Sequence, residues 1–162
     1  DWGLLLNLRW KSKSIMTTNE LILKVVNAGT KIHKQLGSGL THDIYEDCIV
    51  YELAKQNIEV EKQRQVSVKY ENLNFPSAYS IDLLVEKKLV VCLKPINIEA
   101  DIFSRFVEGY MRNLESSSAG LMLDFSVSSF RSGVRIIEKT LFKPVSHPLI
   151  YTEYQYGKKK KK

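Results

Sequence analysis

The segment 79–94, YSIDLLVEKKLVVCLK, decides the fold of this chain. Its first half has the alternation of a β-strand, its middle, EKK, is a polar turn, and its second half, LVVCL, is an apolar run. A continuous apolar run bounded by a turn is typical of a strand that is buried on both faces. The segment therefore predicts a β-hairpin in the interior of a sheet.

Two charged residues of this hairpin stand in an apolar setting. Asp82 lies in the first strand, and Lys94 ends the second. A buried charge is tolerated only when it is paired, hydrogen-bonded or bound to a metal. An acid on one strand, followed by acid-x-Lys on the next, is also the pattern of a Mg²⁺-dependent phosphodiesterase site. Because Cys92 stands where the second acid is expected, the pattern alone leaves an ordinary core hairpin open.

Length and composition predict a single soluble domain. A chain of 162 residues can form one hydrophobic core, and contents of 44% hydrophobic and 26% charged residues are ordinary for a globular protein. No apolar run approaches the ~18 residues that a membrane span needs, so none is expected. Cys48 and Cys92 lack metal-motif spacing, and we expect them to be reduced, in a cytoplasmic, intracellular compartment.

The net charge of +6 belongs to the ends of the chain. Residues 16–157 contain 16 basic and 17 acidic side chains, whereas the run Lys158–Lys162 adds five positive charges. The part that folds is therefore nearly neutral. A basic tail gives salt-sensitive, non-specific affinity for nucleic acid, but it identifies no binding groove.

The chain divides into an N-terminal extension at residues 1–15, a folded domain at residues 16–140, and a C-terminal tail with the Lys run at residues 141–162. The extension carries Trp and Leu side chains at residues 2–10 ahead of a basic patch, which is not the order of a secretory signal. An upstream extension, an artificial addition and a docking arm all remain open for it.

The domain is predicted to be α/β, with the order α-α-β-β-β-β-α-β-β. Thr17 and Glu20 have the spacing of a capping box at the start of the first helix, and Gly37 ends it. The later elements are expected at residues 41–56 (helix), 60–70 (strand-like stretches), 79–85 and 89–94 (strands), 99–114 (helix), and 121–125 and 133–138 (strands). Apolar periodicity predicts that the inward stripes are Ile44, Cys48, Ile49 and Leu53 on the second helix, and Ile102, Phe106, Tyr110 and Leu114 on the third.

Several motifs in this order resemble the GxxExxY family of the PD-(D/E)XK nuclease-like superfamily. They are the turn LGSGL at residues 36–40, the tripeptide IYE at residues 44–46, and the hairpin YSIDLLV that ends in Leu-Lys. The resemblance covers roughly residues 18–138. It implies a three-layer core, in which a mixed β-sheet is flanked by helices and a metal site lies at one edge of the sheet.

The resemblance implies a site that is only partly kept. Gly39 and Tyr45 match the first and last members of the name motif, but His42 replaces its Glu. On the third helix Tyr110 matches the family pattern, whereas Phe106 stands where a Gln is common. Three polar positions of the implied site are changed, and two of these, including Cys92, are carboxylates in the family.

In the hairpin, Asp82 matches the family's metal-binding Asp and Lys94 its catalytic Lys, while Cys92 replaces the Glu two residues earlier. Mg²⁺ prefers hard oxygen ligands, and a thiol and an imidazole are poor replacements for two carboxylates. We therefore expect catalytic chemistry to be lost unless displaced carboxylates rescue it. The candidates for that rescue are Asp43, Glu99 and Asp101.

Three functions follow from these residues. The first is a non-catalytic binding module with the nuclease fold, for protein or nucleic acid, that needs no cofactor. The second is a Mg²⁺-dependent DNA endonuclease or exonuclease that uses displaced carboxylates. The third is a structural subunit of an assembly that docks through residues 2–10. A Zn²⁺ site of His42, Asp82 and Cys92 and a direct Asp82–Lys94 ion pair are further possibilities for the altered site.

Overall fold

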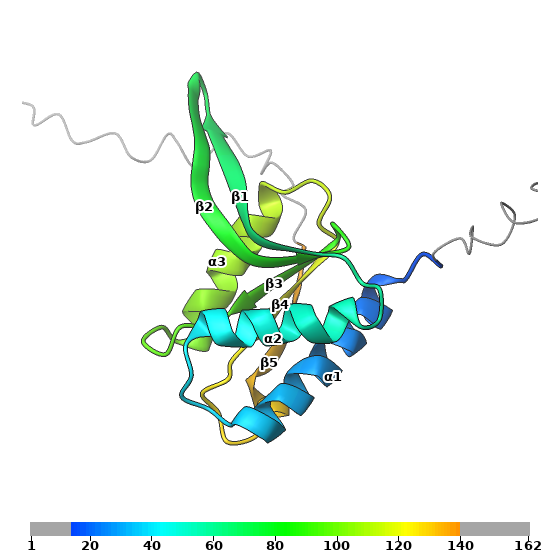
Figure 1. Ribbon diagram of the computed structural model, residues 1–162. Helices are drawn as coiled ribbons and strands as arrows, with labels where there is room; N and C mark the ends of the chain where they lie inside the picture. The colour runs from blue at the N-terminus through cyan, green and yellow to red at the C-terminus, as the bar shows by residue number, and fades with distance from the viewer. Residues whose placement is uncertain (1–13, 140–162) are drawn as a thin grey trace, which may run out of the picture.

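Two helices precede the sheet in the computed structural model, which describes residues 14–139 (Figure 1). Helix α1 (Thr18–Leu36) starts at the expected capping box, in which the Thr17 side chain accepts from the Glu20 N–H and the Glu20 carboxylate accepts from the Thr17 N–H. Helix α2 (His42–Ala54) follows a turn in which Gly39 has a φ of +101°. The extension, including residues 2–10, and the Lys tail lie outside the described residues.

A five-stranded mixed sheet forms the middle of the domain, with the spatial order β1-β2-β3-β4-β5. The strands are β1 (Val60–Tyr70), β2 (Leu73–Val85), β3 (Leu89–Leu93), β4 (Ala119–Leu123) and β5 (Val134–Glu138). Neighbouring strands are antiparallel except β3 and β4, which run parallel. Helix α3 (Ala100–Arg112) makes the crossover that a parallel pair requires, and a short 3₁₀ helix (Phe130–Gly133) precedes β5.

The predicted α/β class, with a mixed sheet between helices, is confirmed. The hairpin lies in the sheet interior as expected, and all five residues of β3 are buried. Three strands, and not four, separate α2 from α3, because Val60–Tyr70 is one continuous strand. The next strand also starts earlier than expected, at Leu73. Pro76 is accommodated within it where the pairing with β1 is irregular, so that its missing N–H removes no ladder bond.

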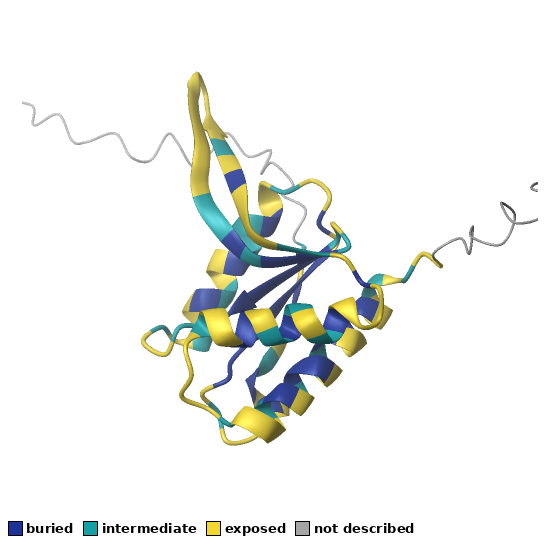
Figure 2. Cartoon of the chain, in the orientation of Figure 1, coloured by how far each residue is buried: buried dark blue, intermediate teal, exposed yellow. Residues whose placement is uncertain are grey.

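The sheet separates two hydrophobic clusters. The larger cluster joins the sheet to α1 and α2 and includes Ile49 and Leu93, whereas the smaller joins the sheet to α3 and includes Val90 and Val107. Figure 2 shows the buried central strands between the helices. No helix within residues 14–139 is long and apolar enough to cross a membrane.

The inward faces of two helices differ from those expected. On α3, Ile102 and Phe106 are 45% and 46% exposed. The residues of α3 that are buried instead are Phe103, Val107 and Met111. On α2, Ile44 is 41% exposed and Cys48 only half-buried, while Tyr45 and Glu46 point inward beside Ile49 and Leu53. Neighbouring helix positions differ by about 100°, and periodicity does not choose between two adjacent apolar stripes.

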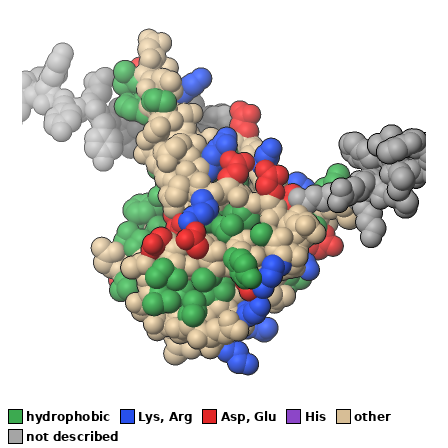
Figure 3. Space-filling model, in the orientation of Figure 1, with side chains coloured by type: hydrophobic (Ala, Val, Ile, Leu, Met, Phe, Trp, Pro, Cys, Tyr) green, Lys and Arg blue, Asp and Glu red, His purple; other side chains and the backbone are tan. Residues whose placement is uncertain are grey.

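The outer parts of β1 and β2 extend beyond the other strands as a two-stranded arm (Figure 1). The cross-strand pairs Val68–Phe75 and Tyr70–Leu73 put four apolar side chains on one face of this arm. Tyr70, Leu73 and Phe75 are exposed, and Figure 3 shows hydrophobic side chains on the arm.

Candidate functional site

The structure brings a second carboxylate toward Asp82, and it comes from α2. Glu46 is only 4% exposed, and its negative charge lies close enough to Asp82 for the two to interact. The Gln63 side-chain nitrogen donates to both Glu46 oxygens, at 3.1 and 3.3 Å. The Gln63 side-chain oxygen accepts from the Ser80 hydroxyl at 2.9 Å. A polar cluster of residues 46, 63 and 82 therefore occupies the junction of α2 with β1 and β2.

Gln63 lies in β1 directly across from Asp82. Its neighbours Lys62 and Arg64 pair with Leu83 and Ile81 of β2, which places Gln63 opposite residue 82. Gln63 has a φ of +50°, a left-handed conformation that is unusual for a residue with a side chain. Such strained residues persist when the surrounding structure holds them, and they concentrate at functional sites.

Burial governs the charge state of both carboxylates. It raises the pKa of Glu46 above its ordinary value, and the negative charge of Asp82 raises it further, against the Gln63 hydrogen bond that lowers it. Burial likewise raises the pKa of Asp82, opposed by the Leu93 N–H, which donates to Asp82 Oδ2 at 2.8 Å, and by the nearby His42. Both ionised forms are therefore less stable than those of solvated carboxylates.

Cys92 lies opposite Asp82 in the β2–β3 ladder, since Leu83 pairs with Val91 in the same antiparallel register. It is 1% exposed, and burial raises the pKa of its thiol above the ordinary value, so the thiol is neutral at physiological pH. A neutral, buried sulfur contributes nothing to a Mg²⁺ site.

Lys94 does not pair with Asp82, so the expected Asp82–Lys94 ion pair is wrong. The Lys94 ammonium donates to the carbonyl oxygens of Pro95 at 2.9 Å and Ile98 at 3.0 Å. It lies 3.3 Å from Asp124 Oδ2, and both side chains of this ion pair are about nine-tenths buried. The reason is register: Leu93 pairs with Leu123 of the parallel strand β4, which sets Lys94 level with Asp124.

Asp124 also closes the turn after β4. Its Oδ1 accepts from the Ser126 N–H at 2.9 Å and from the Ser126 hydroxyl at 2.6 Å. Burial by itself raises the pKa of Asp124, but the Ser126 hydrogen bonds and the Lys94 charge outweigh it and leave the pKa below its ordinary value. Asp124 is therefore ionised at neutral pH and pairs with Lys94 as a charge.

Gly39 and Tyr45 hold the turn between the helices. The Tyr45 hydroxyl donates to the Gly37 carbonyl at 2.7 Å and accepts from the Leu40 N–H at 3.2 Å, while its ring stacks on Phe125. Tyr45 is 1% exposed, so it is a packing residue whose hydroxyl is satisfied. Gly39 supplies the positive φ of the same turn.

Tyr110 lies on the opposite side of the cluster. Its ring stacks on Tyr79, with centroids 4.3 Å apart. Burial raises the pKa of the Tyr110 phenol, and Cys92 and Asp82 raise it further, which brings this residue within electrostatic reach of the cluster. The structure therefore gathers His42, Asp82, Cys92 and Tyr110, and leaves Lys94 with a different partner.

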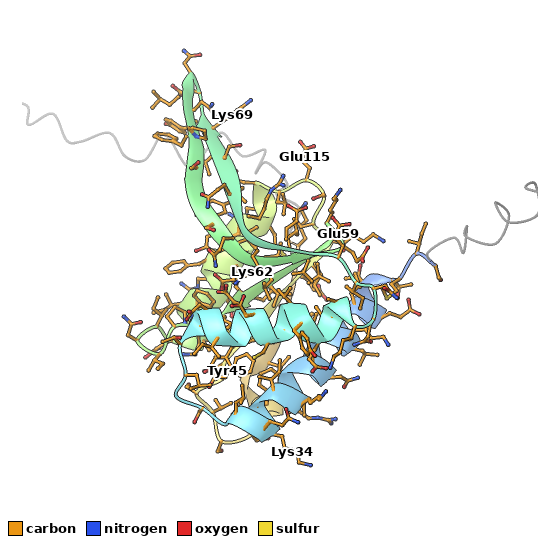
Figure 4. The ribbon with its side chains drawn as sticks, in the orientation of Figure 1. Lys34, Tyr45, Glu59, Lys62, Lys69 and Glu115 are labelled. Atoms are coloured by element: carbon orange, nitrogen blue, oxygen red, sulfur yellow. The ribbon has the colours of Figure 1, made fainter. Side chains whose placement is uncertain are left out.

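The carboxylates considered as replacements lie elsewhere. Asp101 pairs with Arg135 at 2.6 Å, and Asp43 is exposed in the first turn of α2, where the Thr41 hydroxyl lowers its pKa. Glu99 immediately precedes α3. A lysine, Lys62, lies near Glu46. Its ammonium is 3.8 Å from Glu46 Oε2 and also pairs with Asp47. Figure 4 shows Lys62 beside the first half of α2.

A metal ion at this cluster would need ligand atoms from its side chains. Mg²⁺ is commonly held by one or two carboxylates, with water and substrate oxygens completing an octahedron. Here Gln63 engages both oxygens of Glu46, and the Leu93 N–H engages one oxygen of Asp82. Across residues 14–139, no three His, Cys, Asp or Glu side chains are placed to hold a metal, and this includes the His42–Asp82–Cys92 set. The cluster therefore offers a metal two carboxylates, both already hydrogen-bonded, and no third ligand of these types within residues 14–139.

The fold and this cluster agree with a comparison to known families. Residues 19–137 match the model of the PD-(D/E)XK nuclease superfamily, and the chain therefore belongs to that superfamily. Comparisons with curated proteins and with solved structures gave no match.

Two members of the cluster, Glu46 and Gln63, were missed from the sequence. Glu46 follows His42 by four residues, a spacing that places both on one face of a helix. That spacing is a usable signal for Glu46, in addition to its place in the IYE tripeptide. Gln63 carried a weaker signal, because its position opposite Asp82 depends on the strand register.

Proposed function

We propose that this domain binds nucleic acid without hydrolysing it, as a GxxExxY-type member of its superfamily whose metal site has degenerated. The observation that carries this proposal is the environment of Lys94. An ammonium has three N–H donors, and those of Lys94 face two carbonyl oxygens and the Asp124 carboxylate. The residue is 8% exposed, and no donor remains for an attacking water or a phosphate.

The carboxylate side of the site supports the same proposal. The Cys92 thiol replaces an anionic ligand at the centre of the cluster, and Glu46 and Asp82 are both engaged by neighbouring donors. We also propose an intracellular, reducing compartment, with which the free cysteines Cys48 and Cys92 are compatible.

The purified chain is expected to show no Mg²⁺- or Mn²⁺-dependent cleavage of single- or double-stranded DNA above a buffer control. The physical reason is the loss of two metal-ligating carboxylates at residues 42 and 92. Cleavage is measured with end-labelled substrates, with Asp82→Ala as the matched control for a contaminating nuclease. Cleavage that disappears in Asp82→Ala would contradict the proposal.

A metal-dependent nuclease is the second candidate, and one observation favours it. Glu46 and Asp82 provide two neighbouring carboxylates, and Lys62 brings an ammonium to within 3.8 Å of Glu46. In this alternative Glu46 acts as the displaced acid and Lys62 takes the role expected of Lys94. Cleavage that is lost in Glu46→Gln and in Lys62→Met, but kept in Lys94→Met, would identify it.

The C-terminal lysines are expected to supply most of the affinity at low salt. Deleting Lys158–Lys162 removes five positive charges from a chain whose remainder is close to neutral. Each phosphate contact contributes about 0.7 to the slope of log affinity against log salt on single strands, so losing five lysines should make the slope shallower by up to about 3.5. Anisotropy titrations over a salt series measure this slope. Unchanged low-salt binding by a chain that ends at Gly157 would contradict the expectation.

A further inference from the structure

A groove of about 420 Å³ lies where β2 meets α3, beside the polar cluster. Its lining residues are Tyr79, Arg105, Phe106, Gly109, Tyr110 and Asn113. Three of the six are aromatic and none is acidic. Tyr110 links this groove to the cluster, because it packs against the buried group that includes Cys92. The groove therefore opens beside the position at which the superfamily's chemistry is expected.

The aromatic wall of the groove is held in place by its own contacts. The Tyr79 and Tyr110 rings stack at 4.3 Å with 24° between their planes. The Tyr79 hydroxyl donates to the Tyr110 carbonyl at 3.1 Å, which anchors β2 to the helix. Phe106 is 46% exposed, and it meets the buried Phe103 edge-on. One aromatic ring is thus presented to solvent beside a fixed aromatic pair.

The floor of the groove is open at Gly109. A Cβ added there would meet no atom within 4 Å. Glycine within a helix interior is less favourable than alanine, so the sequence forgoes helix stability at this position. A planar group can approach the helix backbone here more closely than a side chain would permit.

Charge selects the kind of ligand. Arg105 is the only charged residue of the lining, and it makes no ion pair or hydrogen bond with any residue from 14 to 139. The neighbouring Arg112 is instead paired with Glu108. An unpaired guanidinium beside exposed aromatic rings, with no acid in the lining, complements a ligand with a planar ring and a nearby anion.

We propose that this groove binds an unpaired nucleotide of single-stranded nucleic acid, with its base against Phe106 and its phosphate at Arg105. The inference rests on the proposed function, and it adds that the nucleic acid is single-stranded and that the groove binds it. Bases in a duplex are stacked on one another and unavailable to an aromatic side chain, whereas unpaired bases stack on such side chains readily. A duplex would use Arg105 alone and leave the aromatic wall unused.

The test is an anisotropy titration of the full chain with labelled oligothymidine and with a duplex of the same length, each over a salt series. Phe106→Ala should weaken oligothymidine binding about 5- to 100-fold with an unchanged salt slope, because stacking releases no counterions. Arg105→Gln should make the slope shallower by about 0.7. Duplex binding should change little with Phe106→Ala.

Gly109→Leu separates binding from folding. The new side chain fills the groove without a clash, and leucine favours a helix more than glycine does, so the melting temperature should rise while oligothymidine affinity falls. Matched controls on other surfaces are Tyr51→Ala, an exposed aromatic of α2, and Arg131→Gln, in the 3₁₀ helix before β5. Both controls should bind as the unmodified chain does.

The outcomes distinguish this proposal from the proposed function. If the unmodified chain binds oligothymidine and the groove variants bind it equally well, the groove proposal is overturned and the proposed function stands, which leaves the groove to a protein partner. If Phe106→Ala weakens duplex and single strand alike, the preference for unpaired bases is overturned. If the unmodified chain binds neither nucleic acid, both proposals are overturned.

Discussion

Lys94→Met is expected to lower the free energy of unfolding by about 3–5 kcal/mol, the range seen when one member of a buried ion pair is removed. The variant leaves the Asp124 carboxylate buried with only its Ser126 hydrogen bonds, and it leaves the carbonyls of Pro95 and Ile98 without the ammonium donor. Asp124→Asn keeps the side-chain shape and should destabilise the domain by leaving the Lys94 charge uncompensated.

The double variant Lys94→Met/Asp124→Asn should recover much of that loss, because neither uncompensated charge remains. Denaturant midpoints of the four proteins give the coupling energy, which should exceed about 1 kcal/mol for groups in direct contact. Asp82→Asn combined with Lys94→Met is the matched control and should be additive, since Asp82 is held by Leu93 N–H and not by Lys94. Strong coupling of Lys94 to Asp82, with none to Asp124, would overturn the pairing.

Introducing carboxylates at residues 42 and 92 is expected to make the stability of the fold depend on a metal. In His42→Glu/Cys92→Glu, two new acids would share the junction with Glu46 and Asp82, whose ionised forms burial already disfavours. Without metal, the variant should be less stable than the unmodified chain by several kcal/mol, because new like charges are brought into a buried setting. Mg²⁺ would neutralise these negative charges, and it prefers carboxylate oxygens as ligands.

The readout is the melting temperature as a function of Mg²⁺ concentration, with calorimetry for the affinity. A metal that binds only the folded state adds about 2.7 kcal/mol of stability at one hundred times its dissociation constant. The unmodified chain and the isosteric control His42→Gln/Cys92→Ser should show no such rise. A folded double-Glu variant that is indifferent to Mg²⁺ would count against the assignment of the site to these positions.

Local patterns predicted the elements from which the domain is built. The capping box at Thr17 and Glu20 forms as expected, because its two hydrogen bonds join residues three apart and need no tertiary contact. The buried hairpin strand was recognisable because five successive apolar residues have no stable position at a protein surface. The continuity of β2 through Pro76 was not predictable locally, since it depends on where β1 ceases to pair regularly.

The candidate site was only partly within reach of the sequence. The resemblance pointed to Asp82, Cys92 and His42, and the structure sets Asp82 opposite Cys92 and within electrostatic reach of His42. The sequence did not identify Gln63 or the partner of Lys94, because both depend on which residues face each other across strands. The stripe of α3 was misplaced for a related reason: two adjacent apolar stripes are equivalent until a sheet covers one of them, and the uncovered one, with Phe106, became the exposed wall of the groove.

The sequence by itself determined the α/β class, the central hairpin, and the boundaries of α1 that a capping box and a glycine set. These properties follow from the identity and spacing of residues close together in the chain. Only the tertiary structure decided that Lys94 pairs with Asp124 and that Glu46 joins Asp82. Both contacts arise from the parallel register of β3 with β4 and from the docking of α2 on the sheet, which are set by the packing of the whole core and not by any segment alone.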